Sequence, residues 1–540
     1  MQDNPPPPAA VFAEAASFKL SIDFLIHDQR SIYSCQKTAD WQGGKRNYRG
    51  PCRLTELTMI EKTTDRLQEF FSPAHIAVVG ASAKNIWFSN ILQNARRIGF
   101  TGRFYPVNPK SSEVFGIPAV PSVADLPEGI IDFAAVIVRS SLVLETVRSL
   151  AERSIKNILL VSSGFSETGD EGARLQKELV DYCSANDVAL VGPNCLGFLN
   201  VIAGSGVFAG GSLEGEILPG NVSVIGQSGA SSEVIATKLL KKGLGISLFV
   251  SSGNEAVITF EDCLEFMVHH GQTKVIVGFI EGFKDVQRLR RIARDAAKKR
   301  IPIVAIKVGR SEKGVQAARS HTGAMAGNDA ITDTFLRQNG IIRVDTIEEM
   351  VETAGILSRC PLPAGDRLAA CTLSGGLVGV YADLCHSLSI ELPDFSPATV
   401  EALRAALPEF AQPGNPLDVT GSGFLSGMDR VLNIILNDEN IDLVATLSFP
   451  PDASTGALAE KYNDYILSHV AASPKPIIPI TFREVSDYAR KYYRDQGLYF
   501  IEHTRDGFKA ISNLIQYARF TRKITAEESA PGAGELRSAG

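Results

Sequence analysis

The 540-residue sequence lacks any apolar run approaching the roughly 18 residues that a membrane-spanning helix needs. It also lacks a basic excess, since 54 lysines and arginines stand against 60 aspartates and glutamates, which leaves no field to attract nucleic acid. Its eight cysteines include no CxxC pair and no metal-ligand spacing, so neither a disulfide framework nor a structural zinc has support. These absences predict a cytoplasmic protein with reduced thiols, no bound metal, and neither a membrane nor a nucleic-acid partner.

The first part of the chain, residues 1–58, lacks a sustained helical or strand period and contains the proline run Pro5–Pro8. We expect it to be a disordered extension. No basic start leads into a clean apolar segment, which disfavours a secretion signal, and scattered acidic residues disfavour an organellar transit peptide. Met59 is an alternative start of translation. The last residues, 523–540, are expected to form a loose polar tail.

From Ser72 onward, strand-like and helical segments alternate. The strand-like runs begin with HIAVVG, RFYPV, DFAAVIV, KNILLVS and ALVGPN, with helical sequence between them. Such alternation is typical of a doubly wound parallel sheet. A chain of this length has room for about three or four domains. The sequence predicts an α/β fold of three consecutive doubly wound parallel-sheet units, Rossmann-like and flavodoxin-like, at residues 59–203, 215–356 and 366–522.

A glycine turn separates the first strand-like run from a helix expected at residues 85–98. Gly80 and Ser82 lie in this turn, where backbone N–H groups at a helix start favour phosphate. The turn is not the GxGxxG pattern of dinucleotide-binding proteins, and the second strand is followed by Asn108 and Lys110 instead of an acidic residue. An amide and a cation suit a ligand with an additional phosphate, such as coenzyme A, although charge alone does not exclude NADP. A purely structural tight turn is the alternative.

The second unit repeats the order of strand, glycine-serine turn and helix. Gln227, Ser228 and Gly229 open a helix that is expected to extend to about Lys241. Free N–H groups and the positive end of the helix dipole would face whatever binds there, which predicts a second phosphate site. An N-cap serine that only caps the helix is the alternative.

A histidine stands in a loop of the same unit. His321 lies among small residues between the strand-like run 301–309 and a helix expected near Asn328. Open α/β sheets bind ligands at loops beyond the carboxyl ends of their strands. An imidazole can act as base, metal ligand or nucleophile, so residue type alone does not choose, and a structural loop histidine is the alternative. Glu281 ends the preceding strand-like run, where its carboxylate could fix the imidazole tautomer and raise its nucleophilicity.

A third unit begins after a proline-containing segment at residues 361–365. The run LAACTLSGG again sets a glycine turn between a strand and a helix, and further strand-like runs follow at residues 442–449 and 476–482. The last helix of this unit is expected to end near Arg522. Three similar units therefore follow one another along the chain.

Taken in order, the motifs of the three units resemble those of the NDP-forming acyl-CoA synthetases, the superfamily of succinyl-CoA synthetase and ADP-forming acetyl-CoA synthetase. The motifs lie between Ser72 and Arg522 and read IAVVGAS, YPVNPK, SSGFSETGDEG, VGPNCLG, GQSGA, SHTGAMAG and GNPLDVTG. The resemblance implies that a carboxylic acid, coenzyme A and ATP or GTP are joined through an acyl phosphate and a phosphohistidine.

The resemblance also implies roles for individual residues. His321 would carry the phosphoryl group, Glu281 would steady it, and the helix end at Ser228, Gly229 and Ala230 would receive the phosphate. Coenzyme A would lie on the first unit, which would be a CoA-binding domain, near Gly80, Ser82, Asn108, Lys110, Ser163, Gly164 and Asn194. The second and third units would be the succinyl-CoA-ligase-like and ligase-CoA domains.

Longer family members carry an ATP-grasp module for which the three units leave no room. The chain therefore resembles an α-type subunit of a hetero-oligomer, in which a separate ATP-grasp β-type subunit would hold ATP or GTP with Mg²⁺. The turn at residues 83–87 differs from the glycine-richer turn of the acetyl-CoA members, which counts against the usual acetate-like acid among small carboxylic acids. A non-catalytic CoA-binding or acyl-CoA-binding protein is the main alternative, and the missing GxGxxG pattern disfavours an NADP-dependent oxidoreductase.

Overall fold

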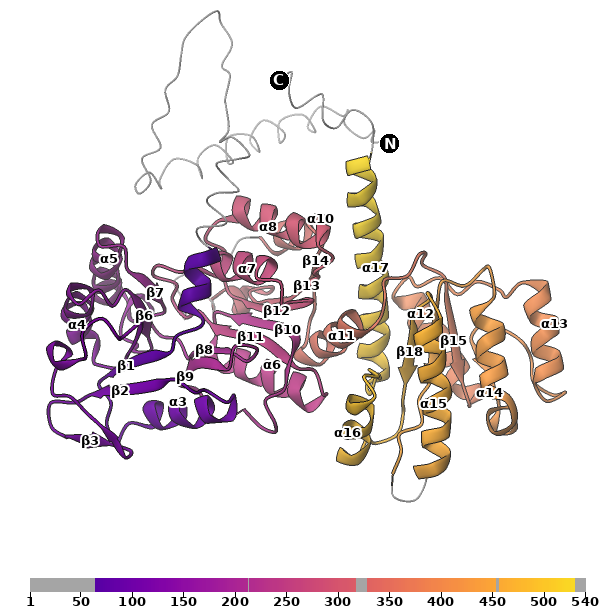
Figure 1. Ribbon diagram of the computed structural model, residues 1–540. Helices are drawn as coiled ribbons and strands as arrows, with labels where there is room; N and C mark the ends of the chain where they lie inside the picture. Colours follow the sequence, from indigo (N-terminus) through magenta and orange to yellow (C-terminus); the bar gives the residue numbers. More distant parts are fainter. Residues whose placement is uncertain (1–63, 212, 317–327, 453–455, 530–540) are drawn as a thin grey trace, which may run out of the picture. The chain divides into compact units, whose positions relative to one another are not determined.

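The computed structural model describes residues 64–211, 213–316, 328–452 and 456–529. Within this part of the chain, the strands form three largely parallel sheets with helices packed around them (Figure 1). The predicted α/β class, with three consecutive parallel-sheet units, is confirmed. The predicted extension at residues 1–58, His321, and residues 530–540 of the predicted tail lie outside the described residues.

The first sheet has the strand order β2-β1-β5-β6-β7, and its neighbouring strands are all parallel. Strand β1 lies between β2 and β5, so the strand order reverses beside β1, where open α/β sheets bind ligands at the carboxyl ends. The strands are β1 (His75–Val79), β2 (Arg103–Val107), β5 (Phe133–Val136), β6 (Asn157–Leu160) and β7 (Ala189–Val191), the helices are α3 (Ile86–Arg97), α4 (Ser140–Glu152) and α5 (Asp170–Ala185), and a small hairpin joins β3 (Glu113–Val114) to β4 (Ile117–Pro118).

The second sheet has the order β14-β13-β12-β10-β11-β8-β9, in which β10 to β14 are parallel. Here the order reverses beside β10, between β11 and β12. The strands are β8 (Gly197–Asn200), β9 (Ser205–Phe208), β10 (Pro219–Gly226), β11 (Ile246–Ser251), β12 (Val275–Ile280), β13 (Ile303–Lys307) and β14 (Ile341–Arg343), and the helices are α6 (Gly229–Lys241), α7 (Phe260–His269), α8 (Val286–Lys298), α10 (Asp329–Gln338) and α11 (Ile347–Arg359).

An antiparallel hairpin of β8 and β9 extends the second sheet at its β11 edge. The sequence did not predict this hairpin, because short strands joined through a loop carry little periodicity. Strand β8 lies within the residues assigned to the first unit, yet it pairs with the second sheet. The unit boundaries stay a prediction, and the strand pairing shows how the chain passes from one sheet to the next.

The third sheet has the order β16-β15-β17-β18, again all parallel. Its last helix, α17, continues beyond Arg522, where the sequence analysis placed its end, because residues 523–529 contain no glycine or proline. The strands are β15 (Leu368–Thr372), β16 (Leu417–Asp418), β17 (Leu443–Leu447) and β18 (Ile477–Ile480), and the helices are α12 (Gly375–Ser387), α13 (Pro397–Ala406), α14 (Gly421–Leu436), α15 (Gly456–Ala472), α16 (Asp487–Asp495) and α17 (Thr504–Ser529).

Polar side chains fix several helix starts where the sequence predicts them. Asn85 Oδ1 accepts from the N–H of Trp87 at 2.9 Å at the start of α3, and Asn328 Oδ1 accepts from the N–H of Ala330 at 2.9 Å at the start of α10. Such caps satisfy N–H groups that have no partner inside the helix. Helices α3 and α10 therefore begin at their predicted positions, and α6 ends at the predicted Lys241.

A shared aromatic core joins the first two sheets. Phe133 of β5 and Phe198 of β8 are fully buried together with Phe70 and Phe71. The rings of Phe70 and Phe133 meet edge to face at 5.0 Å, and those of Phe71 and Phe198 at 5.1 Å. Edge-to-face contacts add directional stabilisation to area burial. One continuous core therefore connects the first sheet with the hairpin edge of the second.

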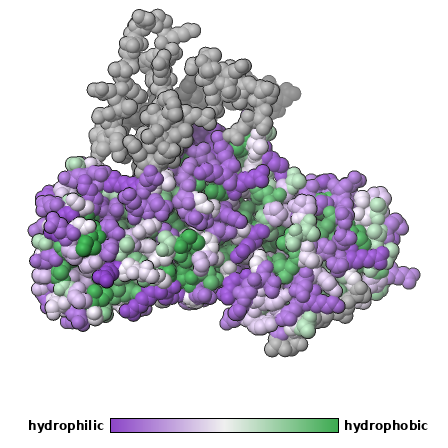
Figure 2. All heavy atoms as spheres, viewed as in Figure 1, coloured by the Kyte–Doolittle hydropathy of each residue, from purple (hydrophilic) through white to green (hydrophobic). Residues whose placement is uncertain are grey.

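Hydrophilic residues cover most of the face shown in Figure 2, with smaller hydrophobic patches between them. Among the described residues, no helix combines the length and the apolar character needed to cross a membrane. Ile86 and Trp87, at the start of α3, are among the exposed large hydrophobic residues.

Candidate functional site

Asn108 joins the turns that follow β1 and β2. Its Nδ2 donates to the carbonyl oxygen of Ala81 at 2.7 Å, and its Oδ1 accepts from the N–H of Lys110 at 2.8 Å. Ala81 lies between Gly80 and Ser82, so the structure brings these four predicted coenzyme A residues together at the carboxyl edge of the first sheet. The amide of Asn108 orders the two turns, and the side chain of Lys110 is exposed.

Two glycines allow the loops of this edge to approach one another. Gly80 has a φ of +90°, and an added Cβ would lie 2.7 Å from the carbonyl oxygen of Ile137, in the loop after β5. Gly164 has a φ of +102°, and an added Cβ would lie 2.8 Å from Oγ of Ser140, the first residue of α4. Both positions need glycine for the left-handed backbone and for space. The loops after β1, β5 and β6 are therefore closely packed.

The remaining predicted coenzyme A residues lie after β6 and β7. Ser163 is exposed, and the N–H of Gly164 donates to the carboxylate of Glu167 at 2.6 Å. Burial acts to raise the pKa of Glu167, but hydrogen bonds from Asn254 and from the N–H of Gly164 outweigh it and lower that pKa. The N–H of Asn194 donates to the loop after β6 at 2.9 Å. An ionised carboxylate thus orders the loop that carries Ser163 and Gly164.

The start of α6 is the predicted phosphate site. Ser228 is the N-cap residue, but its hydroxyl makes no capping hydrogen bond and instead donates to Oγ of Ser231 at 3.0 Å. The N-cap side chain therefore does not occupy the N–H groups of the first turn. Gly229 is needed because an added Cβ would lie 2.7 Å from Cγ of Leu196, and Ala230 is exposed. This helix end can accept an anion.

Gln227 connects the phosphate site with the candidate carboxylate. Its Oε1 accepts from the N–H groups of Glu281 at 2.5 Å and Gly282 at 3.0 Å, while its Nε2 donates to the carbonyl oxygen of Gly282 at 2.9 Å. Strands β10 and β12 are direct neighbours, so Ser228 and Glu281 follow adjacent strands where the strand order reverses. The side chain of Glu281 is buried, with 9% of its residue surface exposed.

A buried lysine lies behind Glu281. Lys307, at the end of β13, donates from Nζ to the carbonyl oxygen of Glu281 at 3.0 Å and to that of Val308 at 2.7 Å. Burial, followed by the nearby charge of Arg343, lowers the pKa of Lys307. A cation in this place favours the ionised form of a neighbouring carboxylate. Lys307 therefore holds the backbone of Glu281, and the nearby charge of Glu281 acts to raise the pKa of Lys307.

The predicted histidine, His321, lies outside the described residues. The described residues on either side of it are the helical residues 312–316, which follow β13, and the start of α10 at Asp329. Strand β13 pairs with β12 in parallel, so the strand that leads to His321 is the neighbour of the strand that ends before Glu281. The two strands are therefore neighbours in the sheet, and the position of His321 stays a prediction.

Sequence reasoning missed Glu255, in the loop after β11. This residue is 4% exposed, has a φ of +58°, and accepts a hydrogen bond at Oε1 from the hydroxyl of Ser252 at 2.8 Å. A left-handed backbone at a residue other than glycine costs energy, and such strained residues cluster at active sites and ligand clamps. Burial, with a contribution from the charge of Glu261, raises the pKa of Glu255 to about 7.

Replacing Glu255 with glutamine should alter the pH dependence of stability. Because the folded pKa is raised from 4.5 to about 7, the stability contributed by the protonated carboxyl is complete below pH 4.5 and is lost as the pH rises through about 7. The loss amounts to on the order of 3 kcal/mol, and the glutamine variant lacks it. In urea unfolding, the wild type should therefore lose stability relative to Glu255→Gln between pH 4.5 and pH 8. Parallel pH dependences of the two proteins would contradict this assignment.

Asn254 ties the edges of the two sheets together. Its Nδ2 donates to Oε2 of Glu167 at 2.5 Å and to Oε1 of Gln176 at 3.1 Å, and its Oδ1 accepts from Nδ2 of Asn194 at 3.3 Å. Glu167, Gln176 and Asn194 belong to the segments around β6 and β7, whereas Asn254 follows β11 of the second sheet. The predicted coenzyme A edge and the predicted phosphate edge are thus hydrogen-bonded neighbours.

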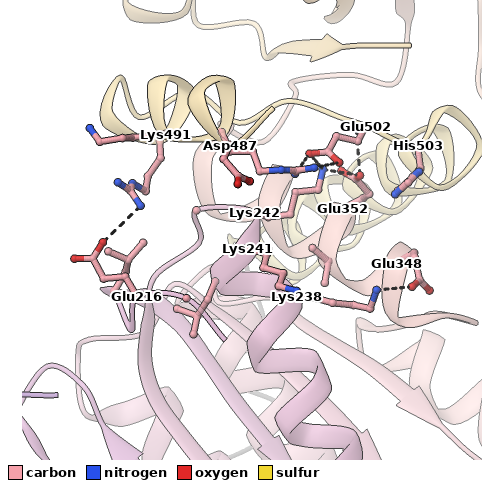
Figure 3. Close-up of a pocket in the computed structure, with 17 residues that line it drawn as sticks. Glu216, Lys238, Lys241, Lys242, Glu348, Glu352, Asp487, Lys491, Glu502 and His503 are labelled. Atoms are coloured by element: carbon pink, nitrogen blue, oxygen red, sulfur yellow. Dashed lines mark hydrogen bonds and ion pairs between the residues drawn. The ribbon is translucent and has the colours of Figure 1, made fainter. Parts of the chain in front are cut away.

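A cavity of about 660 Å³ lies at the other end of α6 (Figure 3). In it, Lys238 pairs with Glu348 at 3.0 Å and the buried Lys242 pairs with Glu352 at 2.9 Å. Helix α6 has 13 residues, and at 1.5 Å per residue the cavity is about 20 Å from Ser228. The lining cations face carboxylates, so their charges are compensated, and the cavity is separate from the candidate site.

The residues that the sequence analysis missed share one signal. Asn254, Glu255 and Lys307 all stand at or just beyond the carboxyl end of a strand of the second sheet, as the predicted Gln227 and Glu281 do. Polar residues at the carboxyl ends of parallel strands are candidates for a binding site, so this position alone would have marked these residues. Their roles depend on hydrogen bonds across the sheet edge, which spacing along one strand does not reveal.

Two known protein domain families match segments of this chain. A CoA binding domain model matches residues 74–200, and a succinyl-CoA ligase like flavodoxin domain model matches residues 219–357. The alpha subunit of the ADP-forming acetate–CoA ligase II of Pyrococcus furiosus is 33% identical over 462 residues, which cover 84% of this chain and 98% of that relative.

Some other relatives are longer than this chain. A trans-feruloyl-CoA synthase from an unknown prokaryotic organism is 32% identical over 467 residues, which cover 85% of this chain and 66% of that protein. Among solved structures, the apo form of the dinucleotide forming acetyl-coenzyme A synthetase 1 of Ca. Korarchaeum cryptofilum aligns with a TM-score of 0.75 and 28% identity, over 86% of this chain and 100% of that one.

Proposed function

We propose that this chain joins a small carboxylic acid to coenzyme A through a phosphohistidine at His321. The chain belongs to the NDP-forming acyl-CoA synthetases as an α-type subunit of an acid–CoA ligase. The observation that carries the proposal is the hydrogen-bonded edge of the second sheet. There Gln227 links Glu281 to the open helix end at Ser228.

The first sheet supports binding of coenzyme A. The chain contains a CoA binding domain over residues 74–200, and Gly80, Ser82, Asn108 and Lys110 gather at the carboxyl edge of its sheet. We expect the exposed Lys110 to face a phosphate of coenzyme A. The loop with Ser163 and Gly164 lies on the side that Asn254 ties to the second sheet, which is where the thiol would have to reach the acyl group.

The second sheet supports the phosphoryl-transfer steps. The imidazole of His321 would accept a phosphoryl group from a nucleoside triphosphate and pass it to the carboxylate of the acid, which gives an acyl phosphate. The thiol of coenzyme A would then attack the acyl carbon, releasing inorganic phosphate and forming the thioester. Glu281 would stabilise the imidazole as it takes up positive charge, and the N–H groups at the start of α6 would bind the phosphate.

A partner subunit is part of the proposal. The Pyrococcus furiosus relative that this chain covers almost completely is named an alpha subunit, and the chain spans 55% of the longer ADP-forming acetate–CoA ligase I of Archaeoglobus fulgidus. We propose that a separate ATP-grasp subunit binds ATP or GTP with Mg²⁺ and forms a hetero-oligomer with this chain.

A screen of carboxylic acids identifies the substrate and tests the proposed activity. The chain should be purified together with an ATP-grasp β-type subunit and assayed for ADP or GDP formation that requires both an acid and coenzyme A. Relatives are named for acetate and for trans-ferulate, so the acids should range from acetate to aromatic acids. Nucleoside diphosphate formation that continues over many turnovers without coenzyme A would contradict the proposal.

Replacing Lys110 with alanine should weaken coenzyme A binding roughly fivefold at low salt, because one charge-assisted contact to a phosphate is lost. The deficit should shrink as salt screens the exposed charge. Lys156→Ala is the matched control, since Lys156 is exposed just before β6, at the amino edge of the same sheet. Equal affinities of wild type and Lys110→Ala in calorimetry would remove Lys110 from the site.

Replacing Glu281 with glutamine should slow phosphohistidine formation by on the order of a hundredfold, since the hydrogen-bonding shape is kept but the charge that favours the reacting imidazole is lost. Coenzyme A affinity and folding should persist. Glu348→Gln makes the same chemical change at the far end of α6 and should leave the rate unchanged. A normal rate in Glu281→Gln, measured by rapid quench, would exclude the proposed role.

A further inference from the structure

Glu255 combines burial with an unused carboxylate oxygen. Its Oε1 accepts from Ser252, whereas its Oε2 has no hydrogen-bond partner among the described residues. A buried polar atom in this state is costly unless something satisfies it at some stage of function. The left-handed backbone at Glu255 adds to that cost. The fold therefore maintains an expensive arrangement at this point.

The carboxyl group of Glu255 lies beside the turn that leads to the phosphate site. Ser252, which donates to Glu255, itself donates from its backbone N–H to the carbonyl oxygen of Gly226 at 2.9 Å. The side chain of Gln227 is near enough to act to lower the pKa of Glu255, but it does not reach hydrogen-bonding distance of Oε2. Gly226 and Gln227 directly precede Ser228, the N-cap of α6. A phosphoryl group at this helix end would therefore come close to Glu255.

The charges around Glu255 do not neutralise it. Glu261, on α7, is 1% exposed and opposes ionisation of Glu255, while Lys284, after β12, favours it more weakly. The thiol of Cys263, also on α7, is fully buried. Arg288, on α8, is engaged by two other carboxylates of α7, those of Asp262 and Glu265, each at 2.5 Å. The backbone N–H of Glu281 donates to Oε1 of Gln227 at 2.5 Å.

We propose that Glu255 is a positioning residue that takes up one proton when a phosphoryl dianion occupies the start of α6. The proposal rests on the proposed function, since it requires a phosphate at Ser228. Protonation converts the Glu255 carboxylate to a neutral carboxylic acid, with the proton taken from solvent. The dianion then lies near the negative charge of Glu281, which the reaction requires, but no longer near a second negative charge on Glu255.

The physical reason is linkage between two binding events. A buried carboxylate and a phosphoryl dianion repel each other more strongly than they would in water, because the surrounding protein screens weakly. Occupation of the helix end must therefore raise the pKa of Glu255 further from about 7. By reciprocity, protonated Glu255 must bind the dianion more tightly than ionised Glu255 does. Affinity for a dianion should fall as the pH rises.

The test measures sulfate binding to the full chain by calorimetry from pH 6 to pH 8. Sulfate is used because it stays a dianion over this range, and the proteins carry His321→Gln so that the imidazole does not titrate. With Glu255 present, affinity should fall roughly tenfold between pH 6 and pH 8. Buffers of different ionisation enthalpy should show uptake of about half a proton per sulfate at pH 7. With Glu255→Gln added, both effects should vanish.

Glu233→Gln is the matched control. Glu233 lies on α6 and burial raises its pKa too, but its carboxylate accepts from the N–H of Gly211, so this variant should keep the pH dependence. Sulfate binding with an unchanged pH dependence in Glu255→Gln would overturn the inference and leave the proposed function standing. Absence of proton uptake with Glu255 present would overturn it even if the glutamine variant failed to fold. No sulfate binding at any pH would overturn both the inference and the proposed phosphate site.

Discussion

Replacing His321 with alanine should abolish acid–CoA ligase activity, with a loss of at least about a thousandfold in the assembled enzyme. The reason is that the proposed reaction has no other carrier for the phosphoryl group, and removal of a covalent nucleophile leaves only binding and electrostatic stabilisation. Steady-state formation of ADP or GDP in the presence of acid and coenzyme A measures this loss.

The control for this prediction is coenzyme A binding. His321 follows the second sheet's strand β13 in the sequence, whereas the predicted coenzyme A residues stand on the first sheet, so His321→Ala should bind coenzyme A with wild-type affinity. A variant that lost both activities would indicate a folding defect. Activity within tenfold of the wild type would exclude the phosphohistidine route.

The isolated chain should form no nucleoside diphosphate from ATP or GTP, acid and coenzyme A, and adding the ATP-grasp subunit should restore the reaction from background to the full rate. The three described sheets match a CoA binding domain, a succinyl-CoA ligase like domain and a third parallel unit. We assign none of them to the nucleotide.

A dose series of the partner tests this dependence. The rate should rise with partner concentration and saturate as the complex forms. The isolated chain should still bind coenzyme A with the affinity that it shows in the complex. Turnover of ATP by the pure single chain at a rate comparable to that of the complex would contradict the α-type assignment and would require a nucleotide site on this chain.

The fold was predictable because its signals are local. Buried β-branched strands, glycine turns and polar caps such as Asn85 and Asn328 recur in order, and the observed helices α3, α6 and α10 begin close to where those residues place them. The hairpin of β8 and β9 was missed because its pairing with β11 depends on contacts between segments that are distant in the sequence, which local periodicity does not reveal. The end of α17 was misplaced because the polar composition of residues 523–529 resembles a tail although it is compatible with a helix.

The candidate site was only partly predictable. Glu281 and Ser228 could be found because each directly follows a strand. The side chain of Gln227, next to Ser228, accepts from the backbone N–H of Glu281, and Nζ of Lys307 donates to the carbonyl oxygen of Glu281. The position of Glu281 therefore depends on contacts between strands. For Asn108, the residue type did not predict what the side chain contacts. Its amide, predicted to meet a ligand, holds two turns together in the structure.

The most direct test of the account is phosphate transfer to the isolated chain. The chain should be incubated with labelled inorganic phosphate and the acyl-CoA of the acid identified in the screen, without partner and without nucleotide. We predict release of coenzyme A and an acid-labile, alkali-stable label that maps to His321 and is absent from His321→Ala. No label, or a label that persists in His321→Ala, would contradict the claim that this chain carries the acid, coenzyme A and phosphohistidine sites together.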